Sequence, residues 1–384
     1  MDGAVDRDAA GTTPAAAAPP HRVDFGRRLV CLLGLPFDAM DLDQAVQRIR
    51  ADAFAGRRCW VSTPNLNFAM TALSDPAFRD SVLRSDLSLV DGMPLVWIAR
   101  LLGVPVPGRV AGSDLFEALQ AHPGPPINVY LFGGPPGAAA LAGENMNRRG
   151  GGVRCVGVLE PGFGSLDSMS SPEIISRINR SNAHFVLVSL GAKKGQAWIE
   201  HNAAQLTAPV LSHLGAVLNF SAGTVRRAPL WMRKSGLEWL WRIKEEPALR
   251  RRYGGDGMRA ARLLLTRVLP DALDTIRGRR AEPAPATVDL ERTTSANRVR
   301  LRGAWPDGAE APLREALMQC SSDDIRVTID LSGVTMLAGT AVALLLLARG
   351  WFGGRGGFDV VGVNPTLAMR LRHMMADRAL LEHL

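Results

Sequence analysis

The feature that most constrains the fold of this chain is the alternation of apolar runs with amphipathic segments between residues 29 and 269. Seven short runs are rich in Val, Leu and Phe, as is typical of strands buried on both faces. They span residues 30–35, 59–63, 87–91, 127–133, 153–159, 184–191 and 208–215. The segments between them carry apolar residues at helical spacing. This order predicts an α/β fold, a parallel sheet with helices on both faces.

Composition divides the chain into five parts. Residues 1–26 are rich in Ala and Pro and predict a disordered lead-in, and residues 27–222 form the α/β domain. Residues 223–270 contain no clear strand and predict a basic helical appendage. Residues 271–296 are polar and contain proline, which predicts a linker. Residues 297–384 again alternate strand and helix patterns, so we expect a second, small α/β domain there.

The net charge of +8 is concentrated in one segment. Residues 226–267 hold twelve Lys and Arg against four acids, and the rest of the chain sums to about zero. Such segments bind nucleic acid, anionic lipid or phosphorylated ligands. Three tryptophans among these arginines (Trp231, Trp239 and Trp241) favour helices that lie on a membrane surface. Helices that cap the α/β domain with solvated arginines are the alternative, and both descriptions can hold together.

Cysteine usage and the termini indicate the compartment. The four cysteines are far apart with no CxxC pair, and no HExxH motif occurs, which argues against a structural metal and favours a reducing cytoplasm. The first twenty residues carry acids early and do not read as a secretory signal. The longest apolar run, residues 341–348, is far short of the roughly 20 residues that span a bilayer. We therefore expect a soluble or peripheral protein.

Polar residues follow two of the predicted strands. In the segment SLVDGMPLVWIARLLG, Asp91 stands between a strand and an apolar helix. A carboxylate there loses hydration. A folded protein tolerates this free-energy cost only if other groups compensate the charge or the carboxylate has a function. Thr63 and Asn65 follow an earlier strand. Because ligands of open parallel sheets bind at the carboxyl ends of strands, we expect these residues to line a crevice. Helix capping by Asp91 and a capped turn at Thr63 and Asn65 are the alternatives.

Further strand-to-helix junctions carry candidate ligand contacts. Arg109 lies between turn-forming glycines in GRVAGSD, where a guanidinium group can pair with a diphosphate. Gly133 and Gly134 in YLFGGPPG open a helix, but their spacing does not match GxGxxG and no Walker lysine follows. Lys194 and Gln196 lie at a later junction, within reach of a ligand bound at the strand ends.

Together these segments resemble the WecG/TagA/CpsF family of bacterial glycosyltransferases (glycosyltransferase family 26) over residues 29–268. The resemblance is carried by TPNLNFAM, SLVDGMPLVW, GRVAGSDLFEAL, YLFGGPPG and NFSAGTVRRAP. It implies a Rossmann-like sheet and an inverting, metal-independent transferase without a cofactor. The implied reaction moves a sugar, of N-acetylmannosamine type or a hexose, from a UDP-sugar to a polyprenyl-diphosphate-linked acceptor in surface or exopolysaccharide synthesis. The implied location is cytoplasmic, peripheral on the anionic inner face of the membrane.

The resemblance also implies residue roles. Asp91 corresponds to the base that deprotonates the acceptor hydroxyl, and inversion in one displacement needs only one such base. Thr63 and Asn65 correspond to the sugar pocket and Arg109 to an active-site arginine. Arg242, Arg251 and Arg252 correspond to arginines of the family's appendage, which is expected to contact the membrane and complete the site. From their junctions, Gly133, Gly134, Lys194 and Gln196 are the other expected substrate contacts.

Two departures from the family pattern bear on activity. The family usually reads Gly-Ala-Pro-Lys-Gln-Glu, whereas residues 191–196 read GAKKGQ, so the glutamine lies one position later and the glutamate is missing. Asn219 stands where the family has an aspartate. These changes keep open a catalytically lapsed member that serves as an interaction scaffold.

The carboxyl-terminal domain resembles a STAS domain, of the anti-sigma-factor-antagonist type, through VTIDLSGVTMLAGTAVALLLLARG and FDVVGVNP. Members regulated by kinases carry Asp-Ser at the start of the following helix, where this chain has Ala338 and Gly339. We therefore expect a docking module for an unknown protein partner. A nucleic-acid partner is not expected, although the basic segment keeps a nucleic-acid binder open as a third alternative.

Overall fold

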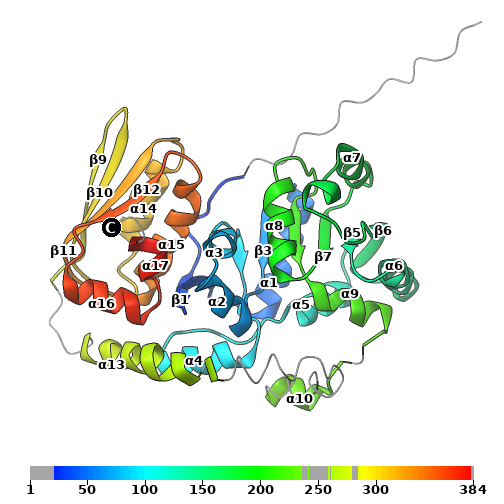
Figure 1. Cartoon of the computed structure of the whole chain (residues 1–384), viewed down its shortest axis with the longest axis horizontal. Helices are drawn as coiled ribbons and strands as arrows, with labels where there is room; N and C mark the ends of the chain where they lie inside the picture. Colours follow the sequence, from blue (N-terminus) through cyan, green and yellow to red (C-terminus); the bar gives the residue numbers. More distant parts are fainter. Residues whose placement is uncertain are drawn as a thin grey trace, which may run out of the picture.

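The structure is a computed structural model that describes residues 21–225, 227–235, 241, 258–259, 261–278 and 284–381. Its larger sheet has six strands in the order β4-β3-β8-β7-β5-β6, and every pair is parallel (Figure 1). The strands are β3 Cys59–Ser62, β4 Leu87–Ser88, β5 Ile127–Gly133, β6 Val153–Leu159, β7 Phe185–Ser189 and β8 Val210–His213. The predicted α/β fold with a parallel sheet is therefore confirmed.

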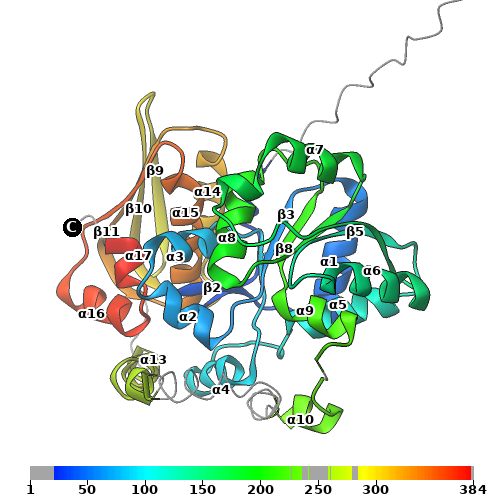
Figure 2. The same ribbon diagram turned by 45° about the vertical axis from the view of Figure 1, so that its right-hand side comes forward.

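Helices cover both faces of this sheet (Figure 2). One face packs against α1 Leu42–Ala55, α5 Gly112–Ala121, α6 Ala138–Arg149 and α9 Gly215–Ala222. The other packs against α7 Pro172–Arg180 and α8 Ala192–Asn202, with Trp198 of α8 stacked on Phe132 of β5 at 4.2 Å between ring centroids. Burial on both faces explains why the strands read as continuous apolar runs.

The first predicted strand, residues 30–35, does not join this sheet. It belongs to an antiparallel hairpin of β1 Leu29–Leu32 and β2 Leu35–Asp38. The turn residues Leu33 and Gly34 have φ of 52° and 75°, the left-handed pair that a tight hairpin turn requires. Arg27 closes the hairpin end through a buried ion pair, with Nη2 2.6 Å from Oδ2 of Asp38. Placing this strand in the sheet was wrong, because a short apolar run does not reveal which sheet buries it.

A second α/β unit follows, with strands in the order β12-β11-β10-β9 (Figure 1). Its strands are β9 Thr287–Arg292, β10 Ala296–Trp305, β11 Arg326–Leu337 and β12 Phe358–Val361, and only β9 runs antiparallel to its neighbour. Its helices are α14 Ala311–Cys320, α15 Gly339–Gly353, α16 Pro365–His373 and α17 Asp377–Leu381. The predicted small α/β unit after the transferase segment is confirmed.

The predicted linker, residues 271–296, contains regular structure. Most of α13, Leu269–Gly278, falls within it, as does β9. The helix follows a π-helical turn at Leu264–Val268 and contacts α4 Met93–Leu102 and α16. Leu269, Leu273 and Ile276 recur at helical spacing, a pattern that the polar, proline-bearing composition of the segment obscured.

The two α/β units share one hydrophobic core. Helix α15 is buried on nearly every side and packs against the hairpin strands and against α3, Pro76–Leu83. The preceding helix α2, Leu66–Ala72, and α4 join the same cluster. The predicted boundaries at residues 222 and 296 stay a prediction. Within the described part of the chain, none of the helices combines the length and apolar character of a membrane span.

Candidate active site

The carboxyl ends of the parallel strands form one edge of the larger sheet. Thr63 directly follows β3, Asp91 follows β4 by three residues, and His213 is the last residue of β8. Since β4, β3 and β8 are neighbours in the sheet, these residues lie in the same region of the edge. This is where the sequence predicts a crevice.

Asp91 does not cap the helix that follows it. Helix α4 begins at Met93, and its N-cap is Gly92, which makes no side-chain capping bond. Gly92 has φ 115°, a left-handed conformation that favours glycine. The backbone N–H of Asp91 instead donates to Pro64 O at 3.0 Å, which ties the acid to the segment after β3. The capping alternative for Asp91 is therefore wrong.

The carboxylate of Asp91 lies against the start of α5. The Gly112 N–H donates to Oδ2 of Asp91 at 3.5 Å, so the positive end of that helix faces the acid. Gly112 also lets α5 approach two strand ends. A Cβ at this position would lie 3.3 Å from Thr63 Oγ1 and 2.6 Å from Leu214 Cδ2. Thr63, Asp91 and the start of α5 are thus neighbours, as the sequence predicts for the first two.

Asn65 has the capping role that the sequence left open. Its side-chain oxygen accepts from Phe68 N–H at 3.0 Å, which makes Asn65 the N-cap of α2. A Cβ on Gly92 would lie 3.9 Å from the Cβ of Asn65, so the cap stands next to the Asp91 segment. The cap uses only the side-chain oxygen of Asn65, and an amide also carries two N–H donors, so a ligand contact of Asn65 stays a prediction.

An arginine cluster surrounds Asp114 in the first turn of α5. Arg109 and Arg227 each lie 2.5 Å from its carboxylate, and Arg233 lies 3.2 Å away. Arg227 and Arg233 also pair with Glu117 on the next turn. Three guanidinium groups therefore face two carboxylates beside the Asp91 region. Sequence reasoning missed Arg227 and Arg233 as site residues, although the segment NFSAGTVRRAP that contains Arg227 carried part of the family resemblance.

Gly133 and Gly134 serve close packing at the end of β5. Their φ values are 93° and 96°, and Gly134 N–H donates to Ser189 O at 2.8 Å. A Cβ would lie 2.7 Å from Ser189 O at the first glycine and 2.7 Å from Leu218 Cδ2 at the second. The start of α6 beyond them is paired with Glu160, whose carboxylate accepts from Gly137 N–H at 2.8 Å and Ala139 N–H at 2.9 Å. A contact of these two glycines with substrate stays a prediction.

Gln196 faces the protein interior. Its side chain is 1% exposed, accepts from Trp60 Nε1 at 3.0 Å and donates to Ser62 Oγ at 2.7 Å. Successive residues of a helix point about 100° apart, so a glutamine at position 196 points in a different direction from one at position 195, where the family has it. The expectation that Gln196 is within reach of a ligand is therefore wrong. Lys194 is partly exposed and its ammonium group donates to Gly164 O at 2.5 Å.

Three predicted appendage contacts, Arg242, Arg251 and Arg252, lie outside the described residues. Among the residues that are described, no group of three or more His, Cys, Asp or Glu side chains is placed to hold a metal ion.

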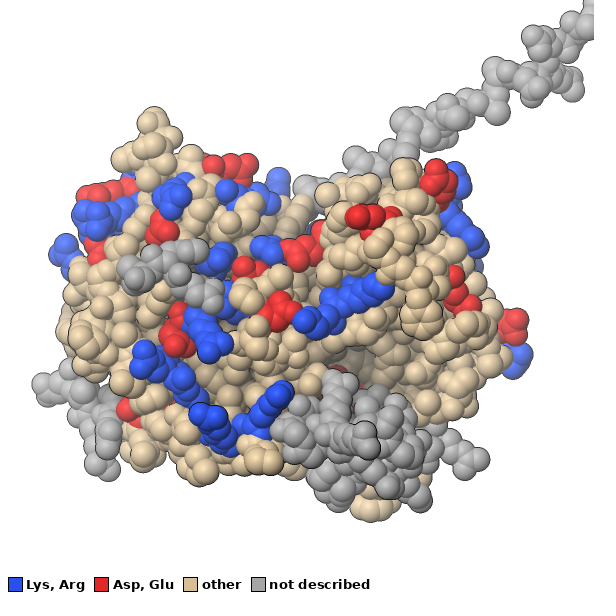
Figure 3. Space-filling model, viewed as in Figure 1, with Lys and Arg blue, Asp and Glu red and all other residues tan. Residues whose placement is uncertain are grey.

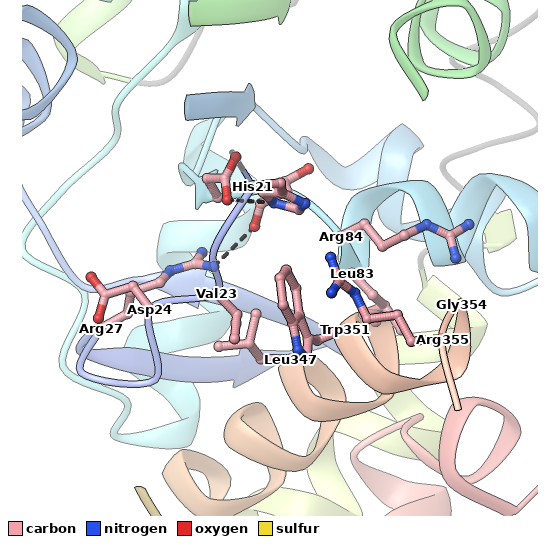
Figure 4. A pocket seen from close by; sticks show the side chains of 13 residues that line it. His21, Val23, Asp24, Arg27, Leu83, Arg84, Leu347, Trp351, Gly354 and Arg355 are labelled. Carbon is pink, nitrogen blue, oxygen red and sulfur yellow. Dashed lines mark hydrogen bonds and ion pairs between the residues drawn. The ribbon is translucent and has the colours of Figure 1, made fainter. Parts of the chain in front are cut away.

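A separate cavity of about 150 Å³ lies where α3, α15 and the amino-terminal segment meet (Figure 4). Arg355 stacks over the Trp351 ring at 3.6 Å, and His21 bonds to Asp86 at 2.8 Å. Arg84 lines the same cavity. None of the predicted site residues does, so this cavity is distinct from the strand-end region.

Comparison with known proteins identifies the larger unit. A curated N-acetylglucosaminyldiphosphoundecaprenol N-acetyl-beta-D-mannosaminyltransferase from Bacillus spizizenii is 26% identical over 194 residues, which are 50% of this chain and 74% of that protein. A solved structure of an anti-sigma factor antagonist from Mycobacterium paratuberculosis is similar to part of this chain. The similarity covers 26% of this chain and 86% of that protein, at 25% sequence identity and a TM-score of 0.24. Residues 30–272 match the family described as "Glycosyl transferase WecG/TagA/CpsF family". The chain is a glycosyltransferase and belongs to the WecG/TagA/CpsF family.

Proposed function

We propose that this glycosyltransferase moves a sugar of N-acetylmannosamine type, or a hexose, from a UDP-sugar to polyprenyl-diphosphate-linked N-acetylglucosamine, without a metal ion. The observation that carries the proposal is the position of Asp91. Its carboxylate does not cap α4 and lies at the strand ends, beside Thr63 and the start of α5. The mannosaminyltransferase name of the Bacillus relative supports the choice of sugar and acceptor.

In the proposed mechanism Asp91 is the general base. It takes the proton from the acceptor hydroxyl as that oxygen attacks the anomeric carbon, and the bond from that carbon to the UDP oxygen breaks on the opposite face. Inversion follows from the single displacement. UDP leaves as an anion, so the reaction needs positive charge rather than a second acid. Arg109, Arg227 and Arg233 supply that charge next to α5.

The surface next to this site has the character of a membrane contact. Helices α4, α10 (Leu230–Ser235) and α13 lie along one side of the molecule, at the bottom of Figure 1. Large apolar side chains are exposed on them and on the turn before α13: Trp97, Leu101, Trp231, Leu265, Leu273 and Ile276. Figure 3 shows Lys and Arg gathered over the region of α16 and α4. Arg100 of α4 and Arg372 of α16 are exposed, as is Arg262 just before the π-helical turn.

Apolar side chains beside arginines are what an interfacial protein presents to anionic lipid. Helix α4 begins two residues after Asp91, so the same short segment joins the proposed base to the exposed Trp97. We therefore place the protein on the inner face of the cytoplasmic membrane, where a lipid-linked acceptor meets Asp91.

Release of UDP by the purified full-length protein tests the proposal. A panel of UDP-sugars is offered with and without a short-chain polyprenyl-diphosphate N-acetylglucosamine. We expect release from at least one donor that depends on the acceptor. If no donor is consumed in the presence of acceptor, the transferase proposal fails, and binding of UDP without turnover would favour the lapsed member. The inward position of Gln196 is the observation that favours the catalytically lapsed member.

A further inference from the structure

The shifted glutamine leaves a glycine on the first turns of α8, and a histidine ring occupies the space beside it. A Cβ on Gly195 would lie 2.6 Å from Nδ1 and 2.7 Å from Cγ of His213. Glycine inside a helix costs about 1 kcal/mol relative to alanine, so its presence there calls for a packing reason. The imidazole supplies that reason, since no larger side chain fits at position 195 while the ring is in place.

The ring of His213 is held in one orientation. Its Nδ1 lies 3.0 Å from Val188 O. A carbonyl oxygen only accepts, so Nδ1 carries the hydrogen and donates. Burial lowers the pKa of His213 to about 4, against a smaller opposing effect of the Val188 bond, so the ring is neutral near pH 7. In a neutral imidazole protonated at Nδ1, the other nitrogen, Nε2, is an acceptor.

Nε2 of this ring has no hydrogen-bond partner within the part of the chain that the structure describes. A Cβ on Gly215 would lie 3.6 Å from Nε2, which is beyond hydrogen-bond distance. Surrounding atoms bury the ring enough to lower its pKa, but the residue as a whole keeps some solvent exposure, in contrast to the buried strand residues before it. The ring therefore offers one acceptor at the carboxyl end of β8.

The position of β8 indicates which part of a substrate this acceptor meets. β8 lies between β3, which leads to Thr63, and β7, while Asp91 follows β4 on the far side of β3. Neighbouring strands lie about 4.8 Å apart, which places the ends of β8 and β4 about 10 Å apart. In the proposed mechanism Asp91 takes the proton of the acceptor hydroxyl, so the acceptor oxygen attacks from the side of Asp91. Because the diphosphate leaves on the opposite face, this mechanism requires the donor sugar beside Asp91, and we place it over the ends of β3 and β8.

We propose that His213 is a specificity-determining residue, whose Nε2 accepts a hydrogen bond from a hydroxyl or acetamido N–H of the donor sugar in place of a side chain at position 195. This inference rests on the proposed transferase function. The competing description is that the ring only fills the space beside Gly195 and bonds to Val188.

Two amide substitutions separate these descriptions. His213→Asn places an amide near the Nδ1 position and keeps the bond to Val188, whereas His213→Gln reaches the Nε2 position. With the preferred donor, we expect His213→Asn to lower kcat/KM roughly 10- to 100-fold, as loss of one buried hydrogen bond does, mainly through KM. His213→Gln should retain at least about tenfold more kcat/KM than His213→Asn. Equal kinetics for the two variants, or a His213→Asn enzyme that matches wild type, would overturn the inference.

A donor analogue and a paired substitution complete the test. Wild type should discriminate against a deoxy or deacetamido donor, and His213→Asn should lose that discrimination. Gly195→Gln alone should clash with the ring, whereas Gly195→Gln with His213→Gly should exceed His213→Gly alone in kcat/KM. Independent, additive effects contradict the proposal. If wild type consumes no donor, the proposed function fails and this inference with it; if wild type is active and the variants behave alike, only the inference fails.

Discussion

Asp271 has its pKa raised to about 6, chiefly because burial disfavours its charged form. Attraction to Arg370 opposes the shift, Asp274 reinforces it, and His373 opposes it more weakly. Its Oδ1 has no hydrogen-bond partner among the described residues, and the side chain is 6% exposed at the start of α13. The carboxyl group is therefore accommodated better as the neutral acid than as the anion.

Asp271→Asn should stabilise the protein at neutral pH. The folded pKa lies above the unfolded value of about 3.9, so the folded state binds more protons between about pH 4 and 6, and stability falls as pH rises through that window. The difference between the folded and unfolded pKa values corresponds to roughly 3 kcal/mol at pH 7. We expect urea denaturation to show a gain of roughly 1–3 kcal/mol at pH 7 and little change at pH 4.

Asp167→Asn, at an exposed position, is the matched control and should leave the denaturation midpoint unchanged at both pH values. An Asp271→Asn protein less stable than wild type at pH 7 would show that the carboxylate is compensated and contradict this account.

At the scale of elements, α15 joins the two α/β units through a glycine contact. A Cβ on Gly350 would lie 2.4 Å from Leu83 O, the last residue of α3, so the glycine lets the two helices close together. Gly350→Ala must move backbone atoms, and overpacking of this kind typically costs 1–3 kcal/mol. We expect a lower midpoint of thermal unfolding.

Gly354→Ala is the control, because a Cβ there meets only the flexible end of Arg84, at 3.7 Å. A Gly350→Ala protein as stable as wild type, with Gly354→Ala destabilised, would mean that the α15–α3 contact is not as close as the structure has it.

The sequence predicted the larger sheet correctly because the alternation of strand and helix is a local pattern. Apolar runs separated by helical segments are typical of a parallel sheet covered on both faces, and β3 to β8 form such a sheet. The hairpin β1–β2 has the same local composition but packs on a helix about 300 residues later, which periodicity does not encode. Helix α13 was missed within the predicted linker because the polar composition of that segment outweighed the helical spacing of Leu269, Leu273 and Ile276.

The site was predictable where it depends on strand ends and not where it depends on side-chain direction. Asp91 and Thr63 meet because parallel strands end at one edge. Gln196 points inward because it lies one residue later on the helix than the family's glutamine. His213 could not be predicted as a site residue, because its contact with Gly195 depends on the fold. Arg227 and Arg233 reach Asp114 from more than 100 residues away, a proximity that only the fold reveals.

At the scale of the whole molecule, the carboxyl-terminal unit shares one hydrophobic core with the hairpin and helices α2 to α4 of the transferase segment. Helix α15 is covered by the hairpin and α3, so a protein partner of this unit, which stays a prediction, would have to bind another face. Thr340 at the start of α15 donates to Asp307 Oδ1 at 2.9 Å and also pairs with Glu310, so carboxylates surround the hydroxyl nearest to the predicted regulatory position.

The apolar side formed by α4, α10 and α13 predicts membrane binding by the intact chain. Replacing the exposed Trp97 and Leu265 together with Ser removes apolar area that anionic vesicles would bury, at about 25 cal/mol per Å². We expect at least a tenfold weaker partition in flotation with anionic vesicles, with a stronger effect at high salt, where arginines contribute less.

Leu141→Ser on α6, also an exposed apolar residue, should float like wild type. If the Trp97 and Leu265 variant binds vesicles unchanged, the membrane lies on another side of the molecule.

The most direct test of the central claim is the rate of sugar transfer by full-length Asp91→Asn beside wild type and Asp167→Asn, with donor binding measured on the same preparations. Loss of a general base lowers turnover by 10²-fold or more, so we predict a kcat at least about 100-fold below wild type with donor affinity nearly unchanged. Turnover within about threefold of wild type would contradict the assignment of Asp91 and with it the mechanism proposed for this transferase.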